Sequence, residues 1–214
     1  MKTLVVIPCY NHEKLCNQLL SNINNHHILI IDDCSSNILS IQKNNNHIKV
    51  YRNKTNKGKG YCIKYAANYA LTNSFTHILV IDADLQHDPS KIDDFINNAN
   101  DHIFVYGKRN FRNPMPIIRR FSNYLTSFII SIYCKKWIYD SQCGYRLYNL
   151  KIFKNLNSKE DGYLFESEIL LKKINKNSSI KHVDIPTIYN KGKSYINNIN
   201  DTLKFIRLIV NNIF

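Results

Sequence analysis

Two aspartates one residue apart, Asp82 and Asp84, are the residues best suited to chemistry in this sequence. They follow the apolar run 78–81, which is typical of a buried β-strand. Strand side chains alternate in direction, so we expect both carboxylates to leave the strand end on the same side. Two such groups repel unless a cation lies between them. With Gln86 they offer the hard oxygens that Mg²⁺ or Mn²⁺ prefers, and such a metal usually takes further ligands from a substrate phosphate.

The same residues also fit a polar strand end before the turn at Asp88-Pro89. The rest of the chain is therefore needed to choose between a metal site and a simple strand end. Short β-branched runs alternate with helical stretches through the first half. Strands are expected at 3–8, 27–32, 47–52, 77–82 and 102–107, and helices at 12–24, 36–44, 59–73 and 89–100. This alternation predicts an α/β fold with a mostly parallel central sheet and helices on both faces. Ligands bind beyond the carboxyl ends of strands in such sheets.

Polar groups follow three of the expected strands, at 8–11, 32–33 and 82–84, which predicts one shared site. In the second half, apolar residues recur with helical spacing from 117 to 132, and 164–174 reads as another helix. A strand is expected at 181–186. The tail 196–214 carries one apolar stripe and predicts an amphipathic helix. The chain shows no internal repeat and no long linker, so we expect a single domain.

Composition narrows the classes of function. There are 29 Lys plus Arg against 16 Asp plus Glu, a net charge of +13, which favours an anionic partner. The abundance of Asn, Ile and Lys also indicates an AT-rich genome, which weakens that argument. The six cysteines form no Cys-x-x-Cys pair, and no signal segment is apparent, which indicates reduced thiols in the cytosol. No stretch reaches the ~18 apolar residues of a membrane span, so the chain is expected to be soluble or to lie on a membrane.

Three further segments could bind or react. Asp32-Asp33 could accept hydrogen bonds from a base or a ribose, or could precede a helix cap at Ser35 or Ser36. The basic loop 53–60 contains glycine and precedes a helix, so it suits a phosphate or is simply solvated, and it lacks the Walker spacing. In 140–146, Asp140 could deprotonate an acceptor hydroxyl or orient a phosphate, and Arg146 could pair with an anion.

Read together, several segments resemble glycosyltransferase family 2 enzymes with the GT-A fold. They are Val5-Val6-Ile7-Pro8-Cys9-Tyr10-Asn11, Ile31-Asp32-Asp33-Cys34-Ser35, Asn56-Lys57-Gly58-Lys59-Gly60 and Asp82-Ala83-Asp84-Leu85-Gln86-His87. The branch most similar is the dolichyl- and polyprenyl-phosphate hexose synthases, through Asp84-Leu85-Gln86-His87-Asp88-Pro89, Gly107-Lys108-Arg109 and Asp140-Ser141-Gln142-Cys143-Gly144-Tyr145-Arg146. Residues 1–107 would then form the nucleotide-sugar half, 108–195 the acceptor half and flap, and 196–214 the amphipathic helix.

The resemblance implies a role for each candidate residue. Nucleotide contacts fall on Pro8, Tyr10, Asn11, Asp33, Lys57 and Asp82, with Lys193 and Ser194 on a flap that closes over the donor. The metal ligands would be Asp82, Asp84 and Gln86. Acceptor contacts fall on Arg109, Arg119, Arg120 and Glu166. The catalytic set would be Asp84, Asp140 and Arg146. The flap departs from the branch, because Lys193-Ser194 is followed by Tyr195 where a basic residue is usual.

The implied activity is a metal-dependent, inverting transfer of a hexose to a polyprenyl or dolichyl phosphate, with a UDP-sugar favoured over GDP-mannose as donor. A lipid phosphate is already ionised, so Asp140 would orient it. Because the branch commonly carries transmembrane helices that this sequence lacks, we expect a cytoplasmic chain with peripheral membrane contact through 117–134 and 196–214, or ordinary core packing of both.

Three alternatives stay open at this point. The acceptor could be a sugar hydroxyl of a glycolipid or surface polysaccharide in envelope synthesis, with Asp140 or Glu166 as the base. A sugar-phosphate nucleotidyltransferase shares the alternation, but its usual glycine-rich loop is replaced here by Pro8-Cys9-Tyr10-Asn11. A basic nucleic-acid-binding protein is the most distant alternative: the charge permits it, but no helix-turn-helix, RNP or zinc pattern occurs.

Overall fold

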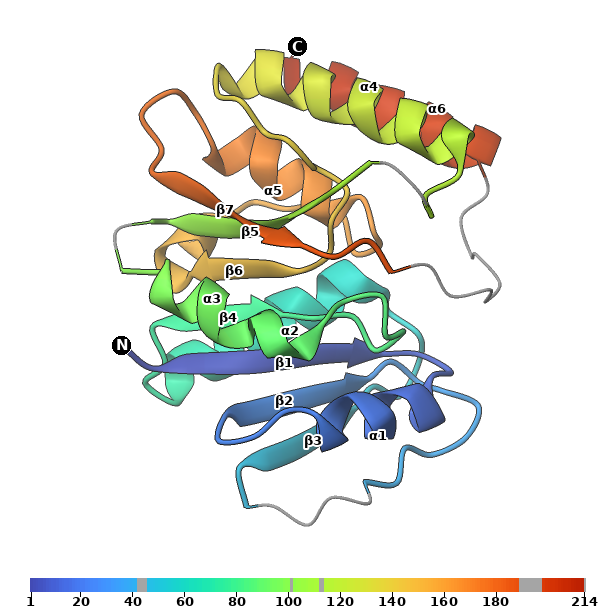
Figure 1. The fold of residues 1–214 in the computed structure, drawn as a ribbon, viewed down its shortest axis with the longest axis vertical. Helices are drawn as coiled ribbons and strands as arrows, with labels where there is room; N and C mark the ends of the chain where they lie inside the picture. Colours follow the sequence, from blue (N-terminus) through green and yellow to red (C-terminus); the bar gives the residue numbers. More distant parts are fainter. Residues whose placement is uncertain (42–45, 101, 112–113, 189–197, 214) are drawn as a thin grey trace.

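The computed structural model describes residues 1–41, 46–100, 102–111, 114–188 and 198–213. Its centre is one seven-stranded sheet with the order β3-β2-β1-β4-β6-β5-β7 (Figure 1). The strands are β1 (Thr3–Cys9), β2 (His27–Asp32), β3 (Ile48–Arg52), β4 (His77–Val80), β5 (Phe104–Arg109), β6 (Arg146–Asn149) and β7 (Ile180–Ile185). The helices are α1 (Glu13–Ser21), α2 (Lys59–Thr72), α3 (Ile92–Asn97), α4 (Ile117–Cys134), α5 (Phe165–Lys173) and α6 (Asn198–Ile213), with 3₁₀ turns η1 (Pro89–Lys91) and η2 (Leu150–Phe153).

The expected mostly parallel sheet is confirmed. Strands β1 to β4 pair in parallel, as do β5 and β7, while β6 runs antiparallel between β4 and β5. Strand β6 was not expected, because its four residues begin with Arg146 and charged residues are rarely fully buried in central strands. Since β5 runs in the same direction as β4, its carboxyl end at Arg109 reaches the same edge of the sheet as the end of β4.

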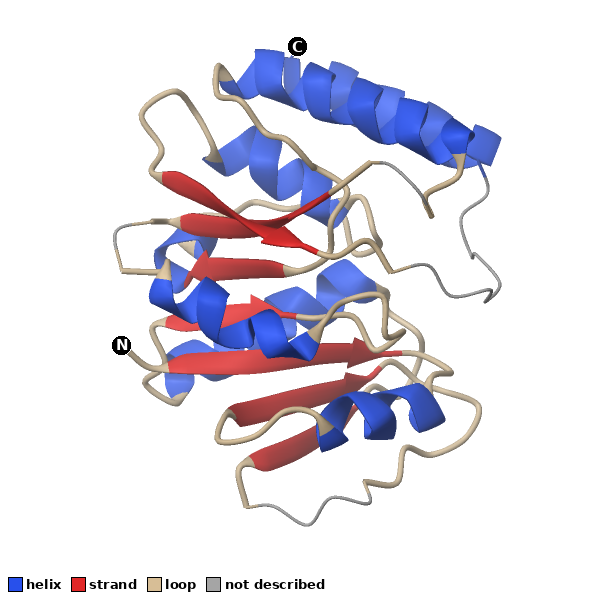
Figure 2. Cartoon of the chain, in the orientation of Figure 1, coloured by secondary structure: helices blue, strands red, loops and turns tan. Residues whose placement is uncertain are grey.

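Helices cover both faces, as Figure 2 shows. Alternate strand residues point to opposite sides, so Val6, Ile31 and Val80 pack with α2 and α5, while Val5, Ile30 and Leu79 pack with α1 and α3. The apolar run of β4 is therefore buried on both sides. This is the packing expected of a strand inside a parallel sheet.

The helix expected at 36–44 is wrong. Residues 36–41 are a loop whose polar groups bond to the α1 region, and 42–45 lie outside the described residues. Ser36 N donates to Asn11 Oδ1 at 2.8 Å, and the Ser40 carbonyl accepts from Asn17 Nδ2 at 2.9 Å. Ser and Asn side chains compete in this way with helical hydrogen bonds.

The segment after Asp84 also differs from the expectation of one helix at 89–100. It begins as the 3₁₀ turn η1, where Asp88 accepts a hydrogen bond from Ser90 N at 2.9 Å, and continues as the short α3. Strand β4 ends at Val80, so Asp82 and Asp84 lie in the turn beyond it and not on the strand itself. Strand alternation is thus not what orients them.

Helices α4 and α6 lie next to one another beyond α5, at the end of the molecule farthest from β3 (Figure 1). Ile130 and Cys134 of α4 and Phe205 and Leu208 of α6 join the core cluster that contains α5. The Tyr133 hydroxyl of α4 donates to the Asn212 carbonyl and links the two helices. Among the helices in the described part of the chain, none combines the length and hydropathy needed to span a membrane.

Candidate active site

The candidate site lies at the carboxyl edge of the sheet, where loops after β1, β2, β4 and β5 meet. The loops after β1, β2 and β4 each contain a non-glycine residue in the left-handed region: Asn11 (φ 56°), Cys34 (φ 65°) and Leu85 (φ 60°). Such a conformation is uncommon for residues with a side chain and is found at functional loops. Asn11 N donates to Ser35 Oγ at 2.9 Å, which ties the first loop to the second.

Asp33 organises the basic loop that precedes α2. Its buried carboxylate accepts from Lys57 N at 2.8 Å, from Gly58 N at 2.7 Å and from Asn53 Nδ2 at 2.7 Å. Gly58 has a φ of 94°, and a Cβ there would overlap the Asp161 carbonyl, so only glycine fits. Asp33 therefore holds the loop in shape, and its expected contact with a nucleotide stays a prediction.

Lys59 joins three elements at one point, a role that sequence reasoning missed. Its Nζ lies 2.5 Å from Asp82 Oδ1 and 3.0 Å from Glu166 Oε1. Burial would lower the pKa of Lys59, but the charges of Asp82 and Glu166 more than offset this, and the pKa is raised. Burial would likewise raise the pKa of Asp82, yet Lys59 and His87 lower it. The one sequence signal for Lys59 was its place in the basic, glycine-containing loop.

Gly144 makes room for this ion pair. A Cβ at position 144 would overlap Asp82 Oδ2 and the Nζ of Lys59. The charged residues of 140–146 made this segment a candidate. Its glycine matters as well, because the backbone at position 144 lies too close to Asp82 and Lys59 for a side chain.

Asp84 is the carboxylate suited to a cation. Its pKa is raised, first by burial and then by the charge of Asp82, so its ionised form is costly without a nearby cation. Its Oδ1 accepts from Gln86 N at 3.0 Å, which shapes the turn. The buried His87 places Nε2 3.5 Å from Asp82 Oδ2, and its Nδ1 has no hydrogen-bond partner within the described residues.

The described residues contain no group of three or more His, Cys, Asp or Glu placed to hold a metal. Mg²⁺ and Mn²⁺ sites that use one or two carboxylates, with substrate phosphates as the other ligands, do not need such a group. The part-buried carboxylate of Asp84 beside Asp82, and His87 Nδ1, which has no hydrogen-bond partner among the described residues, fit a polar ligand at this turn. The residues present therefore fit a divalent cation bound together with a diphosphate.

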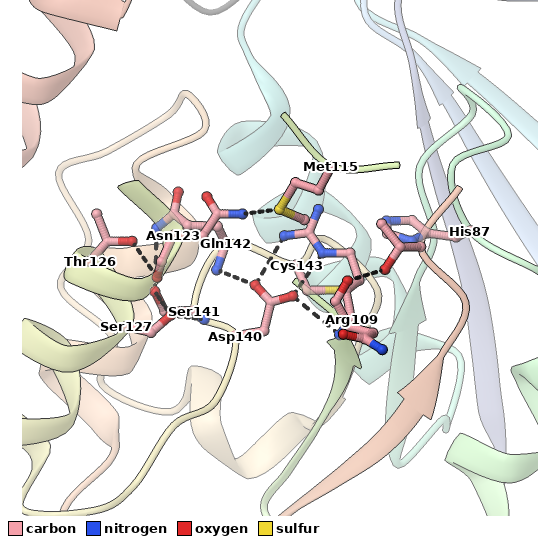
Figure 3. A network of polar contacts seen from close by, with 12 residues as sticks. His87, Arg109, Met115, Asn123, Thr126, Ser127, Asp140, Ser141, Gln142 and Cys143 are labelled. Atoms are coloured by element: carbon pink, nitrogen blue, oxygen red, sulfur yellow. Dashed lines mark hydrogen bonds and ion pairs between the residues drawn. The ribbon is translucent and has the colours of Figure 1, made fainter. Parts of the chain in front are cut away.

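A second polar cluster surrounds Arg109 and Asp140 (Figure 3). Arg109 forms a bidentate ion pair with the Asp140 carboxylate, with Nε 2.7 Å from Oδ2 and Nη2 3.0 Å from Oδ1. Gln142 N donates to the same Oδ1 at 3.2 Å. Asp140 is 1% exposed, so its oxygens are committed to Arg109 and to the backbone. This arrangement positions Arg109 and argues against Asp140 as a free base.

Arg146 does not stand where a substrate anion could reach it. It is fully buried, and its guanidinium donates to the carbonyls of Cys143, Glu166 and Ser141 at 2.7, 2.6 and 2.6 Å. These bonds hold the segment that carries Gly144 against α5. The expectation of a catalytic anion contact is corrected for this reason, and Arg146 is a positioning residue.

Two hollows open near these clusters. One of about 350 Å³ is lined by Asn11, Ser35 and residues at the start of α1. The other, of about 440 Å³, is lined by Lys108, Arg109, Asn110, Phe111, Tyr124, Tyr139, Asp184 and Ile185. The second combines two cations and three aromatic rings with one carboxylate, Asp184, whose Oδ1 lies 3.3 Å from Lys108 Nζ.

The other candidates are placed as follows. Pro8 is half-buried in β1, Tyr10 is 41% exposed, and Lys57 is exposed on the basic loop. Arg119 and Arg120 lie in the first turn of α4, where Arg120 Nε donates to the Met115 carbonyl at 2.7 Å. Gln86 is half-buried in the turn after β4. Lys193 and Ser194 lie outside the described residues, so the expected flap stays a prediction.

Comparison with solved structures agrees with the fold. The chain is similar to glucosyl-3-phosphoglycerate synthase from Mycobacterium tuberculosis, solved with Mn²⁺ and UDP, with a TM-score of 0.72, 12% identity, and coverage of 99% of this chain and 78% of that one. It is also similar to S. aureus TarS 1–349 with UDP-GlcNAc, with a TM-score of 0.63, 21% identity, and coverage of 100% and 66%.

Sequence comparison points the same way. An uncharacterized protein of Methanocaldococcus jannaschii is 29% identical over 96% of this chain and 99% of its own length. A UDP-N-acetylglucosamine–dolichyl-phosphate N-acetylglucosaminyltransferase of Methanococcus voltae is 27% identical over 86% of this chain and 85% of its own. The family model described as glycosyl transferase family 2 matches residues 4–156. The chain therefore belongs to glycosyl transferase family 2 and is a glycosyltransferase with the GT-A fold.

Proposed function

We propose that this glycosyltransferase moves a sugar from a UDP-sugar to a polyprenyl- or dolichyl-type lipid phosphate, with Mg²⁺ or Mn²⁺ and with inversion at the anomeric carbon. The observation that carries the proposal is the pairing of two clusters at one sheet edge. One is the carboxylate turn after β4, and the other is the cationic and aromatic hollow at the end of β5.

The donor side rests on the loops after β1, β2 and β4. Asp33 fixes the basic loop 53–58, whose lysines ahead of α2 suit a diphosphate. The Methanococcus voltae relative is named for UDP-N-acetylglucosamine, and both solved neighbours hold UDP or a UDP-sugar. These likenesses support a UDP-sugar over a GDP-sugar.

The metal would be held by Asp84, with Asp82 and Gln86 beside it. When bound, it would neutralise charge on the diphosphate leaving group. Lys59 keeps Asp82 ionised and in place by pairing with it. Glu166 shares the same cation, so its carboxylate is engaged in the framework of the site.

The acceptor side favours a group that arrives ionised. Asp140 and Glu166, the two candidate bases for a hydroxyl acceptor, are both ion-paired, with Arg109 and Lys59 respectively. Lys108 and Arg109 line a hollow with Phe111, Tyr124 and Tyr139. Cations beside aromatic and aliphatic surface suit a phosphate joined to an apolar chain.

Two assays test the proposal. A thermal-shift scan of UDP- and GDP-sugars, with and without Mn²⁺, should show stabilisation by a UDP-sugar that needs the metal and is lost in Asp84→Ala. Transfer should then be measured to polyprenyl phosphate, to the dephosphorylated polyprenol and to a glycan. Transfer to the phosphate alone is expected. Transfer to the polyprenol or to the glycan, with none to the phosphate, would overturn the acceptor assignment.

A further inference from the structure

Helix α4 presents an unusually apolar outer side. Ile118, Phe121 and Phe128 are 75%, 69% and 51% exposed, and Tyr124, Leu125 and Ile132 lie along the same stripe. Ser127, Ile130 and Cys134 point the other way, into the core. Large apolar side chains gathered in one exposed patch mark an interaction surface.

Helix α6 continues this patch. Leu203, Ile206 and Val210 are 60%, 52% and 47% exposed, while Phe205 and Leu208 are buried toward α5. The helices lie next to one another, joined by the bond from Tyr133 to Asn212 (Figure 1). We call the outer sides of both helices, together with the exposed Trp137, the α4–α6 face.

The charged residues of α4 and α6 indicate what kind of partner the α4–α6 face binds. Helix α4 contains no Asp or Glu, and α6 contains one, Asp201, near its start. Basic residues lie at both ends of α4 and among the exposed residues of α6: Arg119, Arg120, Lys135, Lys136, Lys204 and Arg207. An amphipathic surface with basic residues along it fits an anionic lipid bilayer. A second copy would bring two basic surfaces together in a chain of net charge +13, which opposes self-association.

The α4–α6 face is continuous with the hollow proposed for the acceptor. Tyr124 belongs to the α4 stripe and also lines that hollow, where its ring packs edge-on against Phe111 at 4.9 Å. Tyr139, two residues after Trp137, lines the other side with Lys108 over its ring at 4.7 Å. A lipid whose chain lies in the bilayer could thus place its phosphate at Lys108 and Arg109.

We propose that the α4–α6 face docks on an anionic lipid surface and so presents the Arg109 hollow to membrane-embedded acceptors. The docking itself follows from the exposed side chains and charges. Its role in supplying the acceptor rests on the proposed function.

Vesicle binding is the test, measured without donor or acceptor. Trp137 is the only tryptophan in the chain, follows the end of α4 by three residues and is 58% exposed, so its fluorescence reports on the environment at that end of the helix. With vesicles of phosphatidylglycerol and phosphatidylcholine, its emission should shift to the blue, and brominated acyl chains should quench it. Vesicles of phosphatidylcholine alone should bind more weakly, and added salt should weaken binding to the anionic vesicles.

Matched variants separate this surface from the rest of the molecule. Phe121→Ser/Phe128→Ser should reduce vesicle partitioning by roughly tenfold or more, and Lys204→Glu/Arg207→Glu should remove the preference for anionic lipid. Val50→Ser on β3, 45% exposed at the opposite edge of the sheet, should bind as the unchanged protein does. In Trp137→Phe/Val50→Trp the reporter sits on that far edge and should not be quenched.

If the protein sediments with the vesicles but the fluorescence of Trp137 is not quenched, the proposal is wrong. It is also wrong if Phe121→Ser/Phe128→Ser binds the vesicles as strongly as the unchanged protein. A dimer in solution that dissociates in this variant, without vesicle binding, would assign the face to a second copy instead. Docking without sugar transfer would leave the lipid docking standing and overturn the proposed function, together with the acceptor role that rests on it. Transfer without docking would do the reverse.

Discussion

Lys59 Nζ lies 2.5 Å from Asp82 Oδ1, and this contact joins the basic loop before α2 to the turn after β4. Glu166 of α5 completes the group at 3.0 Å. One cation between two carboxylates, all largely buried, is stable only while every member is present. The predictions on the donor side follow from this relationship.

Replacing Lys59 by Met should destabilise the fold by about 3–5 kcal/mol, because it leaves two part-buried carboxylates without their cation. Chemical denaturation at neutral pH measures this. The double variant Lys59→Met/Glu166→Gln should recover part of the loss, since one uncompensated charge is removed. If Lys59→Met and Lys59→Met/Glu166→Gln have the same free energy of unfolding, Lys59 and Glu166 are not energetically coupled.

The pH dependence of stability has a definite sign. The folded pKa of Asp82 is lowered, so its contribution is present above the ordinary Asp pKa of about 4 and is lost as pH falls through the folded pKa. The folded pKa of Lys59 is raised, so its contribution is present below the ordinary Lys pKa of about 10 and is lost as pH rises through the folded pKa. Unfolding followed from pH 2 to 11 should show that this pair contributes fully between about 4 and 10, an effect absent from Lys59→Met/Asp82→Asn.

Gly144→Ala should cost about 1–3 kcal/mol and weaken donor binding, because the new methyl group overlaps Asp82 and Lys59. Gly162→Ala is the matched control, since a Cβ there meets nothing within 4 Å. Thermal melts and donor titrations of both variants test this. A normal melt and normal donor affinity in Gly144→Ala would contradict the close approach seen in the structure.

Asp84→Asn should abolish transfer while raising the melting temperature of the metal-free protein by about 1–3 °C. The reason is the raised pKa of Asp84, caused by burial and by Asp82, which makes its ionised form costly without a cation. Mn²⁺ with UDP should stabilise the unchanged protein and not the variant. A lower melting temperature in the variant would mean that Asp84 is stabilising without metal.

Asp140→Asn should raise the KM for the acceptor more than it lowers kcat, because Asp140 positions Arg109 and does not take a proton. Steady-state kinetics over a pH range, with Asp140→Glu as the conservative variant, separates the two roles. Loss of the acidic limb of the kcat profile together with a collapse of kcat would identify Asp140 as the base after all.

Much of the order of strands and helices, and the resemblance to the family, could be predicted from the sequence. The alternation of buried strands with helices predicts the parallel sheet, and segments 5–11, 31–35, 56–60 and 82–87 carried the resemblance to the family. The 3.6-residue periods of α4 and α6 gave helices at 117–134 and 198–213, close to those expected. Local backbone preference and hydrophobic periodicity act over a few residues, so a single sequence displays them.

Only the tertiary structure decided which partner each polar group has. It brings Lys59 to Asp82 and Glu166 from elements up to 107 residues apart, and it commits Asp140 to Arg109. It also buries Arg146 in an antiparallel strand that the pattern of apolar residues did not reveal, and turns 36–41 into a loop. Pairing between distant residues depends on how the strands cross over and pack. That is a property of the whole sheet and is not displayed in any local stretch of sequence.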